Sequence, residues 1–185
     1  MSREAANHWR TIAGTFTERV RAVPIDAWAN PSPCHGWTAR DVVAHLVEWV
    51  PPFVESGAGI TIDGIPAIDT DPAAAWAHVD DRIQAILDAD DIGDQIFDHP
   101  LAGRHPLDEA IDRFVLGDVL IHTWDLSRAT GQDERLDPPT VDSMLDGLAA
   151  LGDVLQQSGH YGPRVAVGEH ADNQTKLLAL TGRQA

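Results

Sequence analysis

Apolar residues recur every three or four positions along most of the 185-residue chain, and this periodicity constrains the fold more than any other feature. A repeat near 3.6 residues is that of an α-helix with one buried face, whereas strand-like alternation is nearly absent. The length suits one domain over residues 1–185, with a modest C-terminal appendage at about residues 159–185. We therefore predict an all-α fold of five long helices, without a long strand, packed as a bundle around one core.

Capping residues and helix breakers set the expected bounds of these helices. The first helix has Ser2 as a candidate N-cap and ends before Pro24. The consecutive Pro51 and Pro52 are expected to stop the second. Segments 57–71 and 88–105 lack helical periodicity and are predicted as loops, the first with room for one short strand. The second helix is thus predicted at about Ala39–Val50, behind a Thr38–Asp41 capping box. The third is predicted from the Asp71–Pro72 pair to Leu87, and the fourth at Pro106–Gly131. The fifth begins at Pro138 with an apolar face reaching Leu155, and a short helix is predicted at Thr175–Leu180.

A formal net charge of −16 at pH 7 limits the partners that the chain can have. Phosphate groups would be repelled, which argues against nucleic acids and anionic membrane surfaces. The single cysteine, Cys34, cannot form an intramolecular disulfide, and no apolar run approaches the roughly 20 residues of a membrane-spanning helix. Because the N-terminal residues also lack the apolar stretch of a signal peptide, a cytoplasmic protein is expected.

Two polar residues stand on the apolar face of the predicted fourth helix. Asp118 falls near the middle of this face, and His122 follows one turn later. Burying an unpaired carboxylate costs several kcal/mol, so such a position calls for a partner. An Asp and a His four positions apart bring their Cβ atoms within roughly 5–6 Å, so both can reach one metal ion. The pair is therefore a candidate for two metal ligands, and the alternative is a hydrogen-bonded ion pair.

His45 is the candidate for a third ligand, because it lies at the edge of the inward face of the second helix. Two imidazoles and one carboxylate leave coordination positions open for water or substrate, as in catalytic metal sites. These donors suit zinc, and nickel, iron and manganese are compatible with them.

Asp125 and Cys34 each allow two interpretations. Asp125 continues the line of Asp118 and His122, so it either orients a metal ligand or forms a hydrogen bond to Trp124 or a neighbouring loop. Cys34 is either a nucleophile whose pKa is lowered by the nearby helix start or a buried, inert thiol.

Three segments resemble a known family. The segment Pro33–Leu46, PCHGWTARDVVAHL, is similar to the PCxGWTxRDxxxHL segment of actinobacterial DinB-like proteins, which are related to the N-terminal domain of mycothiol-dependent maleylpyruvate isomerase. The segment Asp118–Gly131, DVLIHTWDLSRATG, resembles the DxxxHTWDLARATG helix of that group, and Gln174–Arg183 resembles its closing segment.

This resemblance implies a DinB-type four-helix bundle with a long crossover between the second and third helices, plus a short extra C-terminal segment. It also implies a divalent metal held by His45, Asp118 and His122, although Asp118 stands where the isomerase has Glu and many DinB proteins have a third histidine. The implied activity is that of a mycothiol-dependent transferase or isomerase for a small electrophilic substrate, in which the metal would hold the thiol as a thiolate. The chain is expected to be too short for the additional C-terminal domain of the isomerase.

Two other functional classes use the same residues. One is a non-catalytic helical bundle in which the metal is structural, sensory or absent, and the other is a metal-dependent hydrolase. An open coordination position would favour an enzyme. A homodimer formed through an exposed helix face is compatible with each class.

Overall fold

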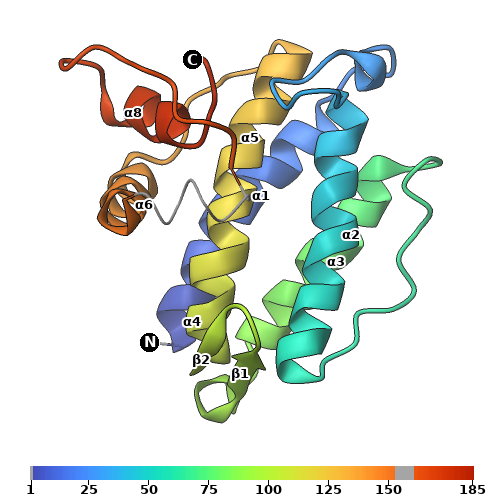
Figure 1. Ribbon diagram of the computed structural model, residues 1–185. Helices are drawn as coiled ribbons and strands as arrows, with labels where there is room; N and C mark the ends of the chain where they lie inside the picture. The colour runs from blue at the N-terminus through green and yellow to red at the C-terminus, as the bar shows by residue number, and fades with distance from the viewer. Residues whose placement is uncertain (1, 153–160) are drawn as a thin grey trace.

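A computed structural model describes residues 2–152 and 161–185 and shows a mostly helical protein (Figure 1). The long helices are α1 (Ser2–Arg21), α2 (Ala39–Ala58), α3 (Pro72–Leu87), α5 (Gly117–Thr130) and α6 (Pro138–Leu151). The shorter elements are η1 (Ala27–Ala29), η2 (Ile92–Asp94), β1 (Ile96–His99), β2 (Gly103–Pro106), α4 (Leu107–Ala110), the π-helical η3 (Ile111–Leu116) and α8 (Asn173–Leu180). Among the described residues, no helix is both long and apolar enough to cross a membrane.

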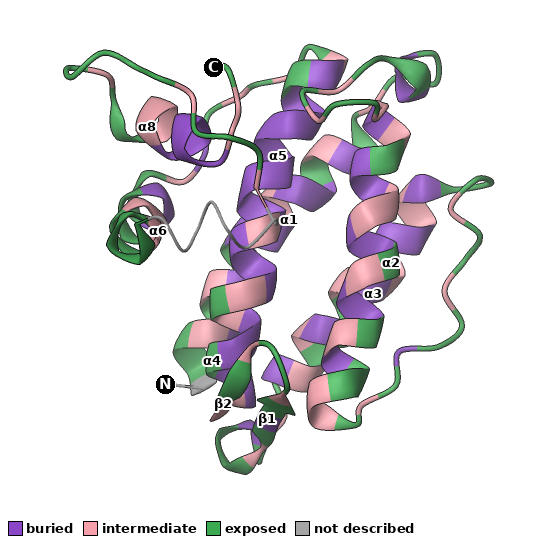
Figure 2. Cartoon of the chain, in the orientation of Figure 1, coloured by how far each residue is buried: buried purple, intermediate pink, exposed green. Residues whose placement is uncertain are grey.

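Four long helices surround the main core. Helix α1 packs against α3 and α5, and α2 packs against the same two helices, while α6 and α8 pack against each other beside α5 (Figure 1). The buried residues of α1, α2, α3 and α5 face the core between these helices (Figure 2). Trp9, Phe16 and Trp76 are fully buried, and the Phe16 ring meets Trp76 edge-on with centroids 4.7 Å apart. Burial of such large apolar groups contributes about 1.5–3 kcal/mol each, which explains why the apolar periodicity predicts these helices.

The predicted caps of α2, α3 and α5 are confirmed, whereas Ser2, expected as the N-cap of the first helix, is the first residue of α1. Thr38 and Asp41 form a reciprocal capping box at the start of α2, and the Asp71 side chain accepts a hydrogen bond from the Ala74 amide at the start of α3. Helix α5 ends at Thr130 and is capped by Gly131, whose left-handed φ of 70° suits a residue without Cβ. The helix from Pro138 and the short C-terminal helix are also confirmed, whereas Leu155 lies outside the described residues.

The prediction that Pro51 and Pro52 end the second helix is wrong. Helix α2 continues through both prolines to Ala58, and Gly59 closes it with a φ of 69°. The prolines remove the amide donors for the carbonyls of Val47 and Glu48. Further along, Val54 is fully buried and the Phe53 ring lies against Phe97 at 4.8 Å. The apolar contacts beyond the prolines offset the lost hydrogen bonds.

The segment 88–105, predicted as a loop, contains a β-hairpin. Strands β1 and β2 pair antiparallel from Ile96 opposite Pro106 to His99 opposite Gly103. Each strand has only four residues, and β1 buries only Phe97, so no alternating pattern is visible in the sequence. Phe97 packs on Gly57 of α2, where a Cβ atom would overlap its ring. A long-range contact therefore fixes the hairpin. The short strand considered for segment 57–71 does not form in that fully described segment.

Candidate metal centre

The structure brings His45, Asp118 and His122 together between α2 and α5. His45 Nε2 lies 2.9 Å from Asp118 Oδ2, and His122 Nε2 lies 3.5 Å from Asp118 Oδ1. One donor atom from each residue lies within 4.8 Å of the other two, so a single small cation can contact all three after modest side-chain adjustment. The donor types and their convergence fit a divalent metal.

Local structure prepares this convergence. Asp118 and His122 stand one turn apart in α5, immediately after the π-helical turn of η3. Single π-helical turns are rare and are frequently found at functional sites. The capping box fixes the start of α2 and places His45 two turns into this helix, opposite Asp118.

The three side chains differ in burial. The His122 side chain is 5% exposed, whereas those of Asp118 and His45 are 20% and 30% exposed. One ligand is thus anchored in the protein interior, and the other two lie at an edge that solvent reaches. The centre is therefore accessible to solvent on the side of His45 and Asp118.

Electrostatics distinguish the two groups on α5. Burial opposes charge on His122, but the carboxylate of Asp118 and the hydrogen bonds with Asp125 and Cys34 raise the pKa of His122 to about 10. Burial also disfavours the Asp118 carboxylate, but the charge of His122 and the hydrogen bond with His45 lower the pKa of Asp118 below its usual value. In the metal-free protein, a proton on His122 therefore neutralises Asp118.

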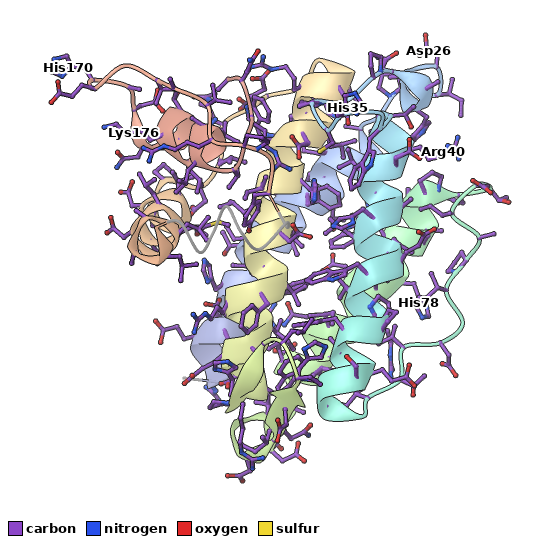
Figure 3. The ribbon with its side chains drawn as sticks, viewed as in Figure 1. Asp26, His35, Arg40, His78, His170 and Lys176 are labelled. Atoms are coloured by element: carbon purple, nitrogen blue, oxygen red, sulfur yellow. The ribbon has the colours of Figure 1, made fainter. Side chains whose placement is uncertain are left out.

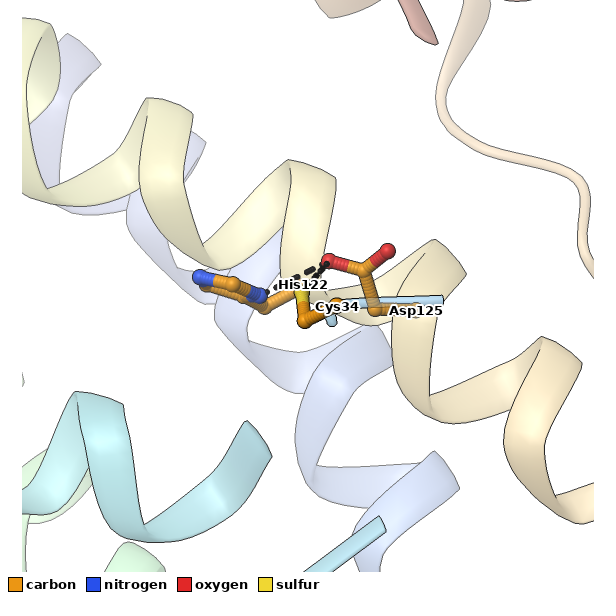
Figure 4. Close-up of side chains that lie close together, drawn as sticks. All are labelled: Cys34, His122 and Asp125. Atoms are coloured by element: carbon orange, nitrogen blue, oxygen red, sulfur yellow. Dashed lines mark hydrogen bonds and ion pairs between the residues drawn. The ribbon is translucent and has the colours of Figure 1, made fainter. Parts of the chain in front are cut away.

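Asp125 forms hydrogen bonds on the opposite side of the His122 ring. It is fully buried, and its Oδ2 accepts a hydrogen bond from His122 Nδ1 at 2.9 Å (Figure 4). Cys34 Sγ, from the loop before α2, lies 3.3 Å from the same oxygen. Because Nδ1 is the donor to Asp125, Nε2 is the nitrogen that can bind a metal. Both contacts considered for Asp125, to a candidate ligand and to a loop, are present.

Indole rings flank the two imidazoles. Trp37 stacks on His122 with centroids 5.8 Å apart and is 5.1 Å from the His45 ring, while Trp49 is parallel to His45 within 9°. This arrangement restricts rotation of both imidazoles and makes the surroundings of the centre apolar, which strengthens charge interactions within it.

The sequence of the chain matches a known protein family over more than half of its length. The family model of the mycothiol maleylpyruvate isomerase N-terminal domain matches residues 9–127. The chain belongs to this family. Two uncharacterized proteins, from two strains of Mycobacterium tuberculosis, are similar to this chain. Each is 30% identical to it over 151 residues, and the match covers 74% of this chain and 72% of the relative. No solved structure matches the chain significantly.

The family match includes every candidate residue named from the sequence, namely Cys34, His45, Asp118, His122 and Asp125. Arg183 lies beyond the matched range, and no pattern in the sequence assigns it a role. The structure places its guanidinium on Asp125, with Nη2 2.7 Å from Oδ2. The two residues are 58 positions apart, so no helical spacing relates them.

Other histidines lie outside the candidate centre. His78 contacts the Asp63 carbonyl at 2.8 Å, and His170 lies at the tip of an outer loop (Figure 3). His8 contacts Asp112 and Thr140 at 2.6 and 2.8 Å. These residues offer matched control positions for substitutions at the centre.

Proposed function

We propose that this protein binds a divalent metal, with zinc as the first candidate, through His45, Asp118 and His122, and uses it in a mycothiol-dependent transfer or isomerisation of a small electrophile. The observation that carries the proposal is the convergence of the three donors, with the far nitrogen of His122 bound by Asp125. We further propose that α1, α2, α3 and α5 form a DinB-type four-helix bundle in a single domain, with segment 59–71 as the long crossover.

The donor set supports a catalytic more than a purely structural metal. Structural zinc sites in proteins are usually closed by four protein ligands, whereas catalytic sites use three and leave a position for water or substrate. Here three donors converge, and two of their side chains are partly exposed. Nickel, iron and manganese accept the same donors, so metal analysis decides among them.

A bound metal would supply a Lewis acid that keeps a thiol deprotonated at neutral pH. The residues of the chain perform the remaining work. His122 can bind a metal only after its Nε2 proton has left, and the Asp118 carboxylate then supplies an uncompensated negative charge to the site. Asp125 keeps the His122 imidazole in the required tautomer. Trp37 and Trp49 limit water around the imidazoles and offer flat apolar surfaces to a substrate. The thiolate would then add to an electrophilic carbon of the substrate, and the displaced π electrons would move onto the adjacent electron-withdrawing group. The adduct would either lose a leaving group, which completes a transfer, or expel the thiolate after bond rotation, which completes an isomerisation.

Metal content and thiol binding test this proposal separately. Untagged protein is expected to bind zinc at about one equivalent, and His122→Ala is expected to lose it while His78→Ala retains it. The zinc-loaded protein is then heated with and without mycothiol, and a rise in Tm is expected because a ligand of the folded state stabilises it.

Three outcomes would assign a different function. Zinc that is substoichiometric and unaffected by His122→Ala rejects the metal site. Zinc binding without a mycothiol shift supports the non-catalytic class instead. Turnover of ester or amide substrates without any thiol would assign a metal-dependent hydrolase.

A further inference from the structure

Arg183 connects the C-terminal segment to the buried carboxylate beside His122. Its Nη2 donates to Asp125 Oδ2 at 2.7 Å, and its Nε donates to Asp125 Oδ1 at 3.3 Å. The Asp125 side chain is fully buried and that of Arg183 is 11% exposed. Solvent therefore screens this ion pair little, and a two-point contact between guanidinium and carboxylate fixes the orientation of both groups.

The C-terminal segment holds Arg183 firmly in place. Leu177 and Leu178 of α8 are fully buried in the core, and the Arg183 amide donates to the Leu178 carbonyl at 2.8 Å. Arg183 Nη1 also donates to the Thr181 carbonyl at 3.0 Å. The guanidinium is thus presented by an anchored turn, and its position depends on the docking of α8.

The ion pair affects His122 through the two oxygens of Asp125. Oδ2 is shared among Arg183 Nη2, His122 Nδ1 and Cys34 Sγ, while Oδ1 is held by Arg183 Nε. A carboxylate held at both oxygens cannot rotate freely, so the imidazole that donates to it keeps its direction. Partners of metal-ligating histidines commonly act in this way.

We propose that Arg183 is a positioning residue for the metal centre, so that docking of the C-terminal segment Asn173–Arg183 and metal binding are thermodynamically coupled. The inference rests on the proposed metal site. It concerns a segment outside residues 9–127, the range matched by the family model. Because coupling between two equilibria is reciprocal, metal binding must stabilise the docked segment as much as docking strengthens metal binding.

Arg183→Lys provides the sharpest test, because it retains the positive charge and removes the two-point contact. Zinc affinity is measured by competition with a chelator, and we expect Arg183→Lys to bind zinc about tenfold more weakly than the unchanged protein. The matched control is Arg104→Lys, which alters an exposed arginine paired with Asp98 on the hairpin and should leave affinity unchanged. Equal affinity of Arg183→Lys and the unchanged protein would overturn the inference.

Hydrogen exchange of the unchanged protein tests the coupling without any substitution. Zinc is expected to slow amide exchange in Asn173–Leu180, and equal exchange with and without zinc would contradict the coupling. If the unchanged protein binds no zinc, the proposed function and this inference fail together. If it binds zinc, but neither Arg183→Lys nor the exchange pattern differs, only the coupling fails.

Discussion

Zinc affinity should continue to rise with pH well above neutrality. The reason is that His122, with a pKa of about 10 in the metal-free protein, must lose a proton before Nε2 can bind a metal. At pH 7, about three pH units below the pKa of His122, removal of this proton costs about 4 kcal/mol and lowers the zinc affinity about a thousandfold. Asp118 is already ionised there because its pKa is lowered.

The slope distinguishes this site from an ordinary histidine site. An imidazole with an unperturbed pKa of about 6.5 would give an affinity that levels off above about pH 7. Here the affinity should rise about tenfold per pH unit between about pH 7 and 9, with one proton released per zinc bound.

Two measurements check this expectation. Chelator competition gives the affinity at each pH after correction for the chelator's own protonation, and calorimetry in buffers of different ionisation enthalpy counts the released protons. A zinc affinity that stays the same within about twofold between about pH 7 and 9 would refute the assignment of a charged His122. The absence of proton release on zinc binding would refute it as well.

Three further predictions concern stability. The metal-free protein should lose on the order of a few kcal/mol of stability as pH rises from about 6.5 to about 10, because protonated His122 stabilises the folded state and loses its proton in this range. Denaturant unfolding across this pH range measures the free energy of unfolding, and a value independent of pH would contradict the prediction. Gly57→Ala should destabilise the fold by about 1–3 kcal/mol because the new Cβ overlaps Phe97, and a rise in Tm would show that the hairpin yields without cost. Thr38→Ala should cost about 1 kcal/mol because it removes the hydroxyl half of the capping box of α2, with exposed Thr61→Ala as a control.

The candidate centre was predictable only in part. Asp118 and His122 are four residues apart in one helix, so apolar periodicity alone makes them neighbours on a buried face. His45 was identifiable as an edge residue of another helix, but its distance to Asp118 depends on how α2 packs against α5. The metal-ligand roles of these residues remain predictions that the zinc experiments test.

The sequence by itself determined the features that depend on local interactions. Helix positions follow from apolar periodicity, and helix starts follow from residues such as Thr38 and Asp71 that bond within three positions. The expectation that nucleic acids and anionic surfaces are not partners likewise follows from the net charge without reference to a fold.

Only the tertiary structure decided which distant groups meet. Helix α2 continues past Pro51 because contacts of Phe53 and Val54 offset lost local hydrogen bonds, and the hairpin forms where Phe97 packs on that continuation. Arg183 reaches Asp125 for the same kind of reason. Its energy comes from a contact across 58 positions, which no local pattern specifies and which exists only after α8 has docked.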